Sequence, residues 1–185
     1  MEKIPQQKAF DGLKIVLYGP ESTGKSTLTK QLTQHYKTVH VEEFARDYLQ
    51  DKYDKTQTIC EYKDLIPIAI GQRISENEAI KEATDYLFCD TDVLETYVYS
   101  MAYFDKAPEE LKTAVSKSDY DLYLLLDVDI PWVADDLRDK PEDRKGMFKR
   151  FEQGLQNFNK KYVIISGTGE DRFKNALAAI ENITN

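Results

Sequence analysis

The chain has 185 residues, of which 41% are hydrophobic and 31% charged, with a formal net charge of −8. This composition fits one globular domain, and its acidic surface argues against a nucleic-acid partner, which needs a basic face. No run reaches the roughly 18 apolar residues of a membrane span, and the first ten residues lack a secretory leader. Cys60 and Cys89 form no paired motif, so we expect two buried, reduced thiols in a cytoplasmic protein.

Five short apolar runs alternate with helical patterns after a lead-in, residues 1–11, that we expect to be disordered. The runs are Leu13–Tyr18, Thr38–Val41, Tyr86–Cys89, Leu122–Leu126 and Tyr162–Ile165. Helical patterns cover 25–35, 62–83, 92–104, 108–117, 143–159 and 171–183. All runs but the second are apolar at nearly every position, which is typical of strands buried on both faces of a parallel sheet. The alternation predicts one α/β domain over residues 12–185, with a five-stranded parallel sheet and helices on both faces.

Two interruptions break these patterns. Pro67 falls inside the helical pattern 62–83, so we expect a kink or a break there. The polar stretch DKPEDRKG at 139–146 predicts a mobile loop between two helical segments. The loop 139–146 and the segments next to it predict a small helical lid over about 131–151. Ligands of such sheets bind beyond the carboxyl ends of the strands, so the informative residues should follow each run.

The first run is followed by a phosphate-binding motif. Gly19–Ser26 reads GPESTGKS and fits GxxxxGK[ST] without a gap. Its glycines let the backbone curl around a phosphate, Lys25 supplies a charge and Ser26 a hydroxyl for Mg²⁺. A glycine-rich turn that only joins a strand to a helix is the alternative, but the context of strand, loop and helix favours a P-loop. We therefore predict ATP and Mg²⁺ at Gly19, Glu21, Ser22, Thr23, Gly24, Lys25, Ser26 and Thr27.

Carboxylates follow the second and third runs. Glu42 and Glu43 come after the second, where a carboxylate can accept the proton of an attacking hydroxyl or simply cap a helix. Arg46 reads as a substrate contact or a surface ion pair. Asp90 ends the third run, where a carboxylate is costly unless it is paired with a cation, so we expect it at Mg²⁺. Asp92 suits a helix cap and is also counted among the substrate contacts.

The fourth and fifth runs are followed by a tryptophan, three arginines and a glycine turn. Trp132, the single tryptophan, is either a core residue or a ring that stacks on a heterocycle. Arg138, Arg144 and Arg150 flank the polar loop, and we expect at least one to neutralise a transferring phosphoryl group; the alternative is a solvent-facing charge. The turn at Gly167 either wraps an adenine or only joins strand to helix.

These motifs together resemble a known family. The stretches GPESTGKS, EFARDY, IAIGQR, CDTD with ETYVYS, YDLYLLLDVDIPWVADDLR and EDRF come in order over about residues 13–183. In this the sequence resembles the ribosylnicotinamide kinase domain of the bacterial NAD-biosynthesis proteins called NadR. The resemblance implies a P-loop fold like that of nucleoside and nucleotide kinases. It also implies an ATP-dependent kinase that phosphorylates the 5′-hydroxyl of nicotinamide riboside to give nicotinamide mononucleotide.

The resemblance also assigns roles by position. Lys25 and Ser26 would serve ATP and Mg²⁺, and Glu43, Arg46 and Asp90 would face the substrate and the metal. Trp132, Asp135 and Arg138 would belong to the nucleoside pocket and the lid. The sequence leaves open whether Glu43 or Asp90 is the base, and whether Arg144 or Arg150 joins Arg138 over the transferred group.

Three functions stay open at this point, namely the nicotinamide riboside kinase and two alternatives. One alternative is a kinase for another nucleoside or for a vitamin alcohol such as thiamine. The other is a P-loop ATPase that switches a protein partner. Full-length NadR proteins carry a nucleotidyl-transfer domain before this one; residues 1–12 are too short for it, so we expect this chain to lack that activity. A homodimer is left open.

Overall fold

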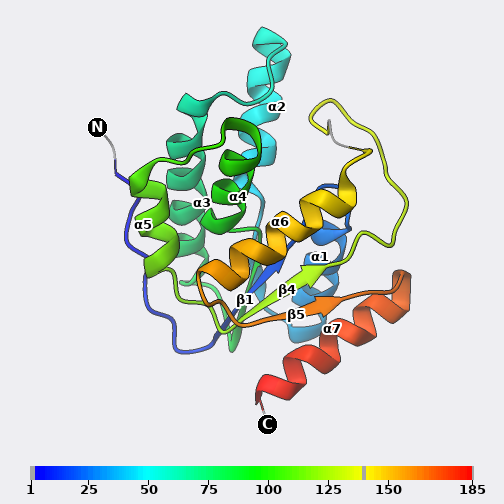
Figure 1. The fold of residues 1–185 in the computed structure, drawn as a ribbon. Helices are drawn as coiled ribbons and strands as arrows, with labels where there is room; N and C mark the ends of the chain where they lie inside the picture. Colours follow the sequence, from blue (N-terminus) through cyan, green and yellow to red (C-terminus); the bar gives the residue numbers. More distant parts are fainter. Residues whose placement is uncertain (1–2, 139–140, 185) are drawn as a thin grey trace.

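The computed structural model of the protein describes residues 3–138 and 141–184. Within these residues five strands form one parallel sheet in the order β2-β3-β1-β4-β5 (Figure 1). The strands are β1 (Leu13–Tyr18), β2 (Val39–Val41), β3 (Tyr86–Asp90), β4 (Leu122–Leu126) and β5 (Tyr162–Ile165). The predicted five-stranded parallel sheet is therefore confirmed, with boundaries that differ by one residue at β2 and β3.

Seven α-helices and one 3₁₀ turn connect the strands in the described part of the chain. They are α1 (Lys25–Tyr36), α2 (Phe44–Thr56), η1 (Tyr62–Asp64), α3 (Leu65–Ala79), α4 (Val93–Phe104), α5 (Glu109–Lys117), α6 (Arg144–Asn157) and α7 (Gly169–Thr184). The sequence patterns missed α2, because none of its residues is buried and no apolar stripe marks it. Among the described helices none is both long and apolar enough to cross a membrane.

Pro67 lies in the first turn of α3, where a helix has no partner for its N–H groups. The expected break is therefore placed just before it, where the 3₁₀ turn η1 changes to α3 at Leu65.

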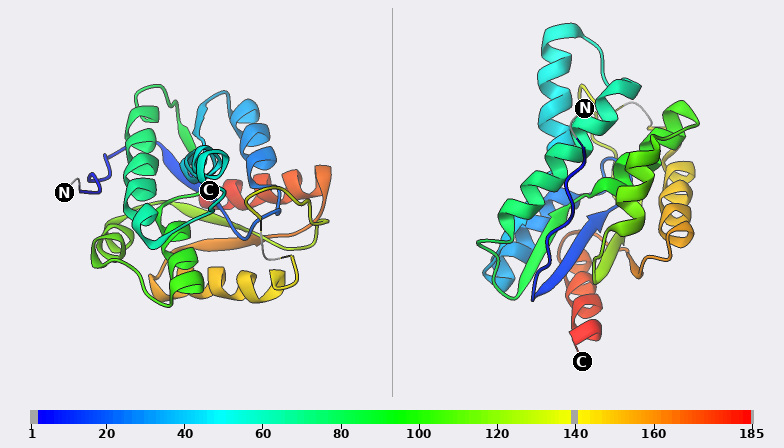
Figure 2. Two further views of the ribbon diagram at one scale, coloured as in Figure 1. Left: turned by 90° about the horizontal axis from the view of Figure 1, so that it is seen from above. Right: turned by 90° about the vertical axis from the view of Figure 1, so that its left-hand side faces the viewer.

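The sheet is covered on both faces. Helices α3, α4, α5 and α6 pack on one face, and α1 and α7 on the other (Figure 2). Successive residues of β1 alternate between these layers: Val16 and Tyr18 pack on the first face, and Ile15 and Leu17 on the second. This explains why the inner strands are apolar at nearly every position. The expectation fails for β5, an edge strand in which Val163 is 39% and Ile164 43% exposed.

The described part of the lead-in, residues 3–11, is held against α3 and α5. The Ile4 N–H donates to Glu110 at 2.7 Å, and the Lys8 N–H donates to Asn77 Oδ1 at 2.8 Å. Asn77 in turn donates to the Gln6 carbonyl at 2.9 Å. The prediction of a disordered lead-in is therefore wrong for these residues, because side-chain acceptors on two helices satisfy its backbone.

The lid segment also differs from the expected helical lid over 131–151. Residues 127–138 and 141–143 contain no helix, and positions 139 and 140 of the expected mobile loop lie outside the described residues. Helix α6 begins at Arg144, and its Met147, Phe151 and Leu155 are buried in the core. The second half of the expected lid is thus a core helix.

A buried polar network fixes α3 against the chain that leads into β4. Arg73, 1% exposed, lies 3.2 Å from Glu76 Oε2 and donates to Ser118 Oγ at 2.5 Å. The Tyr120 hydroxyl donates to the same Glu76 oxygen at 2.6 Å. The buried Glu76 carboxylate is tolerated because it is paired with the Arg73 guanidinium and accepts a hydrogen bond from the Tyr120 hydroxyl.

Substitution of Arg73 by Met should lower the free energy of unfolding by about 3 to 5 kcal/mol, because Glu76 is left without its cation. The double variant Arg73→Met/Glu76→Leu should recover at least half of that loss, which urea titrations of both variants would measure. Losses that simply add would show that the pair is not coupled.

Candidate active site

The phosphate-binding loop joins β1 to α1 at the carboxyl edge of the sheet. Gly19, Ser22 and Gly24 have φ values of 147°, 57° and 80°. A Cβ at Gly19 would lie 3.0 Å from the Leu126 carbonyl oxygen, so only glycine fits this approach to β4. Arg172 supports the loop from outside by donating to the Thr23 carbonyl at 2.8 Å.

Lys25 is the central cation of the loop and is 8% exposed. Its Nζ donates to the carbonyls of Gly19 and Pro20 at 2.7 and 3.0 Å, and lies 3.5 Å from Glu95 Oε1. Burial disfavours the charge of Lys25, but the surrounding carboxylates outweigh it and raise its pKa; they are Glu95, Glu43, Asp90 and Glu21. The lysine therefore stays charged next to the nest in which phosphates bind.

Ser26 and Asp90 meet as the sequence predicts. The Ser26 Oγ donates to Asp90 Oδ2 at 2.5 Å, because Asp90 ends β3 beside Leu17 of β1. Asp90 is 1% exposed, and its Oδ1 is buried without a hydrogen-bond partner in the described residues. Burial raises the pKa of Asp90, against the effects of Lys25 and of the Ser26 bond. A hydroxyl beside an unsatisfied carboxylate oxygen fits a hard cation such as Mg²⁺.

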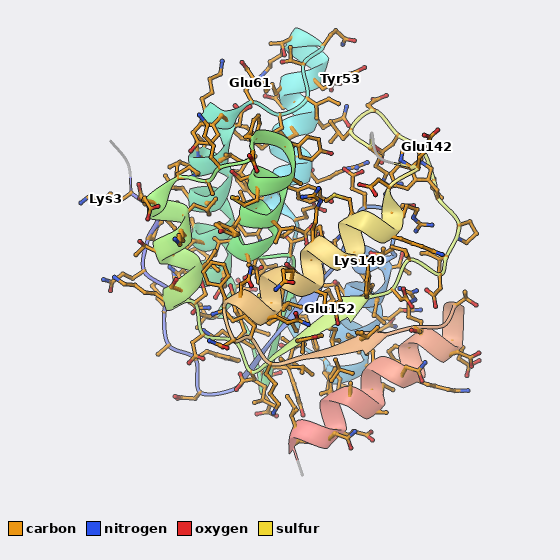
Figure 3. The ribbon with its side chains drawn as sticks, in the orientation of Figure 1. Lys3, Tyr53, Glu61, Glu142, Lys149 and Glu152 are labelled. Carbon is orange, nitrogen blue, oxygen red and sulfur yellow. The ribbon has the colours of Figure 1, made fainter. Side chains whose placement is uncertain are left out.

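A cavity of about 320 Å³ opens beside Lys25, within the size range of ligand pockets. Its polar lining includes Glu43, Arg46, Glu95 and Arg138. Its apolar and aromatic lining is formed by Leu49, Ile59, Cys60, Leu65, Ile68, Tyr99, Tyr103 and Phe104 from α2, α3, α4 and the segments between them. Figure 3 labels Tyr53 on α2 and Glu142 before α6, and these two segments flank the carboxyl edge of the sheet.

The structure separates the two acids that follow β2. Glu43 occupies the N-cap position of α2 and lines the cavity, whereas Glu42 is exposed and lies 3.0 Å from His40 Nε2. Burial raises the pKa of Glu43; Lys25 opposes this and Asp90 reinforces it. A carboxylate with a raised pKa beside a phosphate site suits a general base.

Asp135 organises the two arginines of the cavity instead of lining it. Its Oδ2 accepts from Arg46 at 2.6 Å and lies 3.1 Å from the Arg138 Nε. Burial would raise the pKa of Asp135, but the Arg46 hydrogen bond and the Leu137 N–H outweigh it and lower the pKa. Asp135 therefore ties the 127–138 loop to α2 and aligns Arg46 and Arg138 along the cavity wall.

Trp132 and Arg144 lie together at the phosphate-binding loop and line no part of this cavity. Arg144 donates to the carbonyls of Ile130 and Ser22 at 2.6 and 3.0 Å, and its guanidinium lies 5.8 Å from the Trp132 ring centroid. The Trp132 ring therefore packs beside the Arg144 guanidinium and outside the wall of this cavity, and its predicted contact with a nucleoside stays a prediction. Arg150 is exposed on α6 and also lies outside the cavity wall; Lys149 and Glu152 mark this helix in Figure 3.

Asp92 is the N-cap residue of α4 and does not line the cavity. Its Oδ1 accepts from the Glu95 N–H at 3.4 Å and its Oδ2 from the Tyr123 hydroxyl at 2.7 Å. Both oxygens are therefore occupied by the cap and by a core tyrosine, so the geometry supports the helix-cap alternative over a substrate contact.

Two residues of the site escaped the sequence patterns. Glu95 lies in the first turn of α4 and is 4% exposed, and Arg172 lies in α7. Arg172 bonds the carbonyls of Gly167 and Thr23 and pairs with Asp129, so it links the Gly167 turn to the phosphate-binding loop. Both lie in stretches that carry the resemblance, ETYVYS and EDRF, but neither was assigned a role, because a charged residue in the first or second turn of a helix usually faces solvent.

The two cysteines differ in exposure. Cys89 is buried in β3 as expected, but Cys60 is only partly buried and lines the cavity, so the prediction of two buried thiols is wrong for Cys60. Both thiols are free. Burial, reinforced by Asp64, raises the pKa of Cys60 to about 11.

Because only the thiolate is reactive, iodoacetamide should alkylate Cys60 at pH 7 about 100-fold more slowly than an ordinary cysteine. The rate should rise steadily as the pH approaches about 11. Mass spectrometry would follow the labelling, and Cys60→Ser should abolish it because Cys89 is buried. Rapid labelling at pH 7 would show that the thiol is not desolvated.

Comparison with known proteins agrees with this geometry. Two curated relatives are named "Trifunctional NAD biosynthesis/regulator protein NadR". The one from Salmonella typhimurium is 30% identical over 173 residues, 92% of this chain and 42% of that protein. The one from Escherichia coli is 30% identical over 165 residues, 88% of this chain and 40% of that protein. The chain thus spans about two fifths of the length of these relatives, and the resemblance to NadR is confirmed.

Solved structures share the fold. A NadR protein in complex with NR superimposes with a TM-score of 0.74 at 23% identity, over 94% of this chain and 52% of that one. A deoxyadenosine kinase from M. mycoides superimposes with a TM-score of 0.66 at 12% identity, over 92% of this chain and 100% of that one. The fold is therefore the P-loop fold of nucleoside and nucleotide kinases. A family model described as "AAA domain" matches residues 14–172, so the chain belongs to the AAA domain family AAA_28.

Proposed function

We propose that residues 12–185 form one ATP-dependent kinase domain that phosphorylates the 5′-hydroxyl of nicotinamide riboside to nicotinamide mononucleotide. The observation that carries the proposal is the direct junction of the phosphate-binding loop with a cavity of ligand size, with Glu43 beside Lys25 at the junction. The names of the relatives, which refer to NAD biosynthesis, and a NadR structure that contains NR support this acceptor.

Lys25 would turn from the Gly19 and Pro20 carbonyls to the β- and γ-phosphates of ATP. Ser26 and Asp90 would hold Mg²⁺, and the unpartnered Asp90 Oδ1 supports this assignment. The described residues contain no cluster of three metal-binding side chains, so phosphate oxygens and water would complete the coordination. When bound, Mg²⁺ supplies neutralisation of the charge that develops on the phosphate oxygens.

Glu43 is the proposed base, which accepts the proton of the acceptor hydroxyl as its oxygen attacks the γ-phosphorus. Its place on the cavity wall favours it over Asp90, whose pKa is also raised but whose Oδ2 is taken by Ser26. Arg46 and Arg138, aligned by Asp135, would stabilise the transferred group from the acceptor side. Arg144 would act from the side of the phosphate-binding loop.

A kinase for another nucleoside is the second candidate. The cavity lining offers Tyr99, Tyr103 and Phe104, and stacking on aromatic rings does not by itself distinguish one flat heterocycle from another. We further propose a cytoplasmic enzyme that acts on small molecules and not on nucleic acid, which the two free thiols and the net charge of −8 support. The homodimer stays a prediction.

ADP release from Mg²⁺-ATP should be strongly stimulated by nicotinamide riboside, with a mononucleotide product, in a panel that includes other nucleosides and thiamine. Stimulation by another panel member would keep the kinase and change its acceptor. If no panel member stimulates turnover, the kinase proposal fails and a hydrolytic switch with a protein partner replaces it.

Glu43→Gln should lower kcat by about 10²- to 10⁴-fold, because the amide cannot take up the proton of the hydroxyl. The Kd for ATP, measured by calorimetry, should change by less than about threefold because the phosphate contacts remain. Glu78→Gln is the control, since its side chain is exposed on α3 and lines no part of the cavity. Normal transfer by Glu43→Gln would move the role of base to Asp90.

A further inference from the structure

Glu95 is a buried carboxylate that the proposed reaction does not use. It lies in the first turn of α4 and lines the cavity, and its Oε1 is 3.5 Å from Lys25 Nζ. Its Oε2 is also buried and has no hydrogen-bond partner within the described residues. Buried side-chain oxygens almost always have a partner, so an unsatisfied one in a cavity wall indicates where a ligand supplies it.

The charges around Glu95 restrict what that partner can be. Burial raises the pKa of Glu95 well above its ordinary range; Lys25 opposes this, whereas Glu43, Asp90 and Asp92 reinforce it. Such a carboxyl group can meet its ligand charged or protonated. A hydroxyl group satisfies both forms, because it can donate to a carboxylate and accept from a carboxylic acid.

The partner belongs to the acceptor and not to the nucleotide. Lys25 and the backbone of the loop draw the phosphates to the loop side, where Glu95 already meets Lys25 through Oε1, so Oε2 is left for the acceptor. Glu95 lies beside Lys25, and the aromatic side chains Tyr99 and Tyr103 follow it along successive turns of α4 in the lining of the same cavity. The part of the acceptor that contacts Glu95 is therefore next to the transferred phosphoryl group, and a ring would lie further along α4.

We propose that Glu95 Oε2 hydrogen-bonds a hydroxyl group of the acceptor other than the one that is phosphorylated. Glu95 is then a specificity residue for acceptors that carry further hydroxyl groups, as a ribose does. This inference rests on the proposed kinase function and names a contact within its acceptor site.

Glu95→Met removes the hydrogen bond at similar size, and Glu95→Gln keeps one. The acceptor in these assays is whichever panel compound the wild-type protein phosphorylates. Glu95→Met should raise the KM for the acceptor by about 10- to 100-fold, with Glu95→Gln intermediate. The Kd for ATP should stay within about threefold. The same change at Glu78, which is 59% exposed on α3, is the control and should leave both constants unchanged.

Two further measurements separate a ligand contact from a structural role. The melting temperature of Glu95→Met should fall only slightly, because Lys25, which loses its nearest carboxylate, keeps the Gly19 and Pro20 carbonyls and the charges of Glu43 and Asp90. Acceptors that lack the 2′- or the 3′-hydroxyl should identify the contact: for one of them, the wild type and Glu95→Met should have similar kcat/KM values.

The proposal would be overturned if removal of either hydroxyl from the acceptor lowered kcat/KM by the same factor in the wild type and in Glu95→Met. So would a much lower melting temperature with an unchanged acceptor KM, which would make Glu95 structural. Failure of the wild type to phosphorylate any acceptor is a different result, since it overturns the proposed function first and this inference with it.

Discussion

A single buried cation, Lys25, sets the arrangement of this site. Its ammonium group is held by two carbonyls of the phosphate-binding loop and faces Glu95, with Glu43 and Asp90 close enough to raise its pKa. Asp90 and Glu95 are buried and Glu43 is partly buried, each at the end of a different element, and each would be costly without a nearby positive charge. Lys25, the cation proposed to bind a phosphate, is therefore also the positive charge that stabilises these three carboxylates at the edge of the sheet.

The sheet creates this meeting point because its strands are parallel. The loop after β1, Glu43 after β2 and Asp90 at the end of β3 all reach the same edge. Strand β3 lies between β2 and β1, so Asp90 is brought to Ser26 by register and not by proximity in sequence. Both faces of the inner strands are covered, which keeps this edge rigid under the acids.

A second set of contacts holds the loop from its outer side. Arg144 bonds the Ser22 carbonyl and Arg172 the Thr23 carbonyl, so segments after β4 and β5 fix the same short turn. Asp135 links the 127–138 loop to α2 through Arg46. The phosphate end is thus fixed by the sheet, whereas the acceptor end depends on α2, α3, α4 and one irregular loop.

The sequence alone determined the features that depend on local spacing. Short runs, four of them apolar at nearly every position, predicted the five strands, GPESTGKS predicted the loop, and the strand ends predicted the meeting of Ser26 with Asp90. The sequence could not separate the exposed Glu42 from Glu43 on the cavity wall, or show that Asp92 and Trp132 have other partners. It also missed α2, Glu95 and Arg172. Only the tertiary structure decided these, because each depends on which way a helix face or an irregular loop turns toward the sheet edge, and no local pattern records that direction.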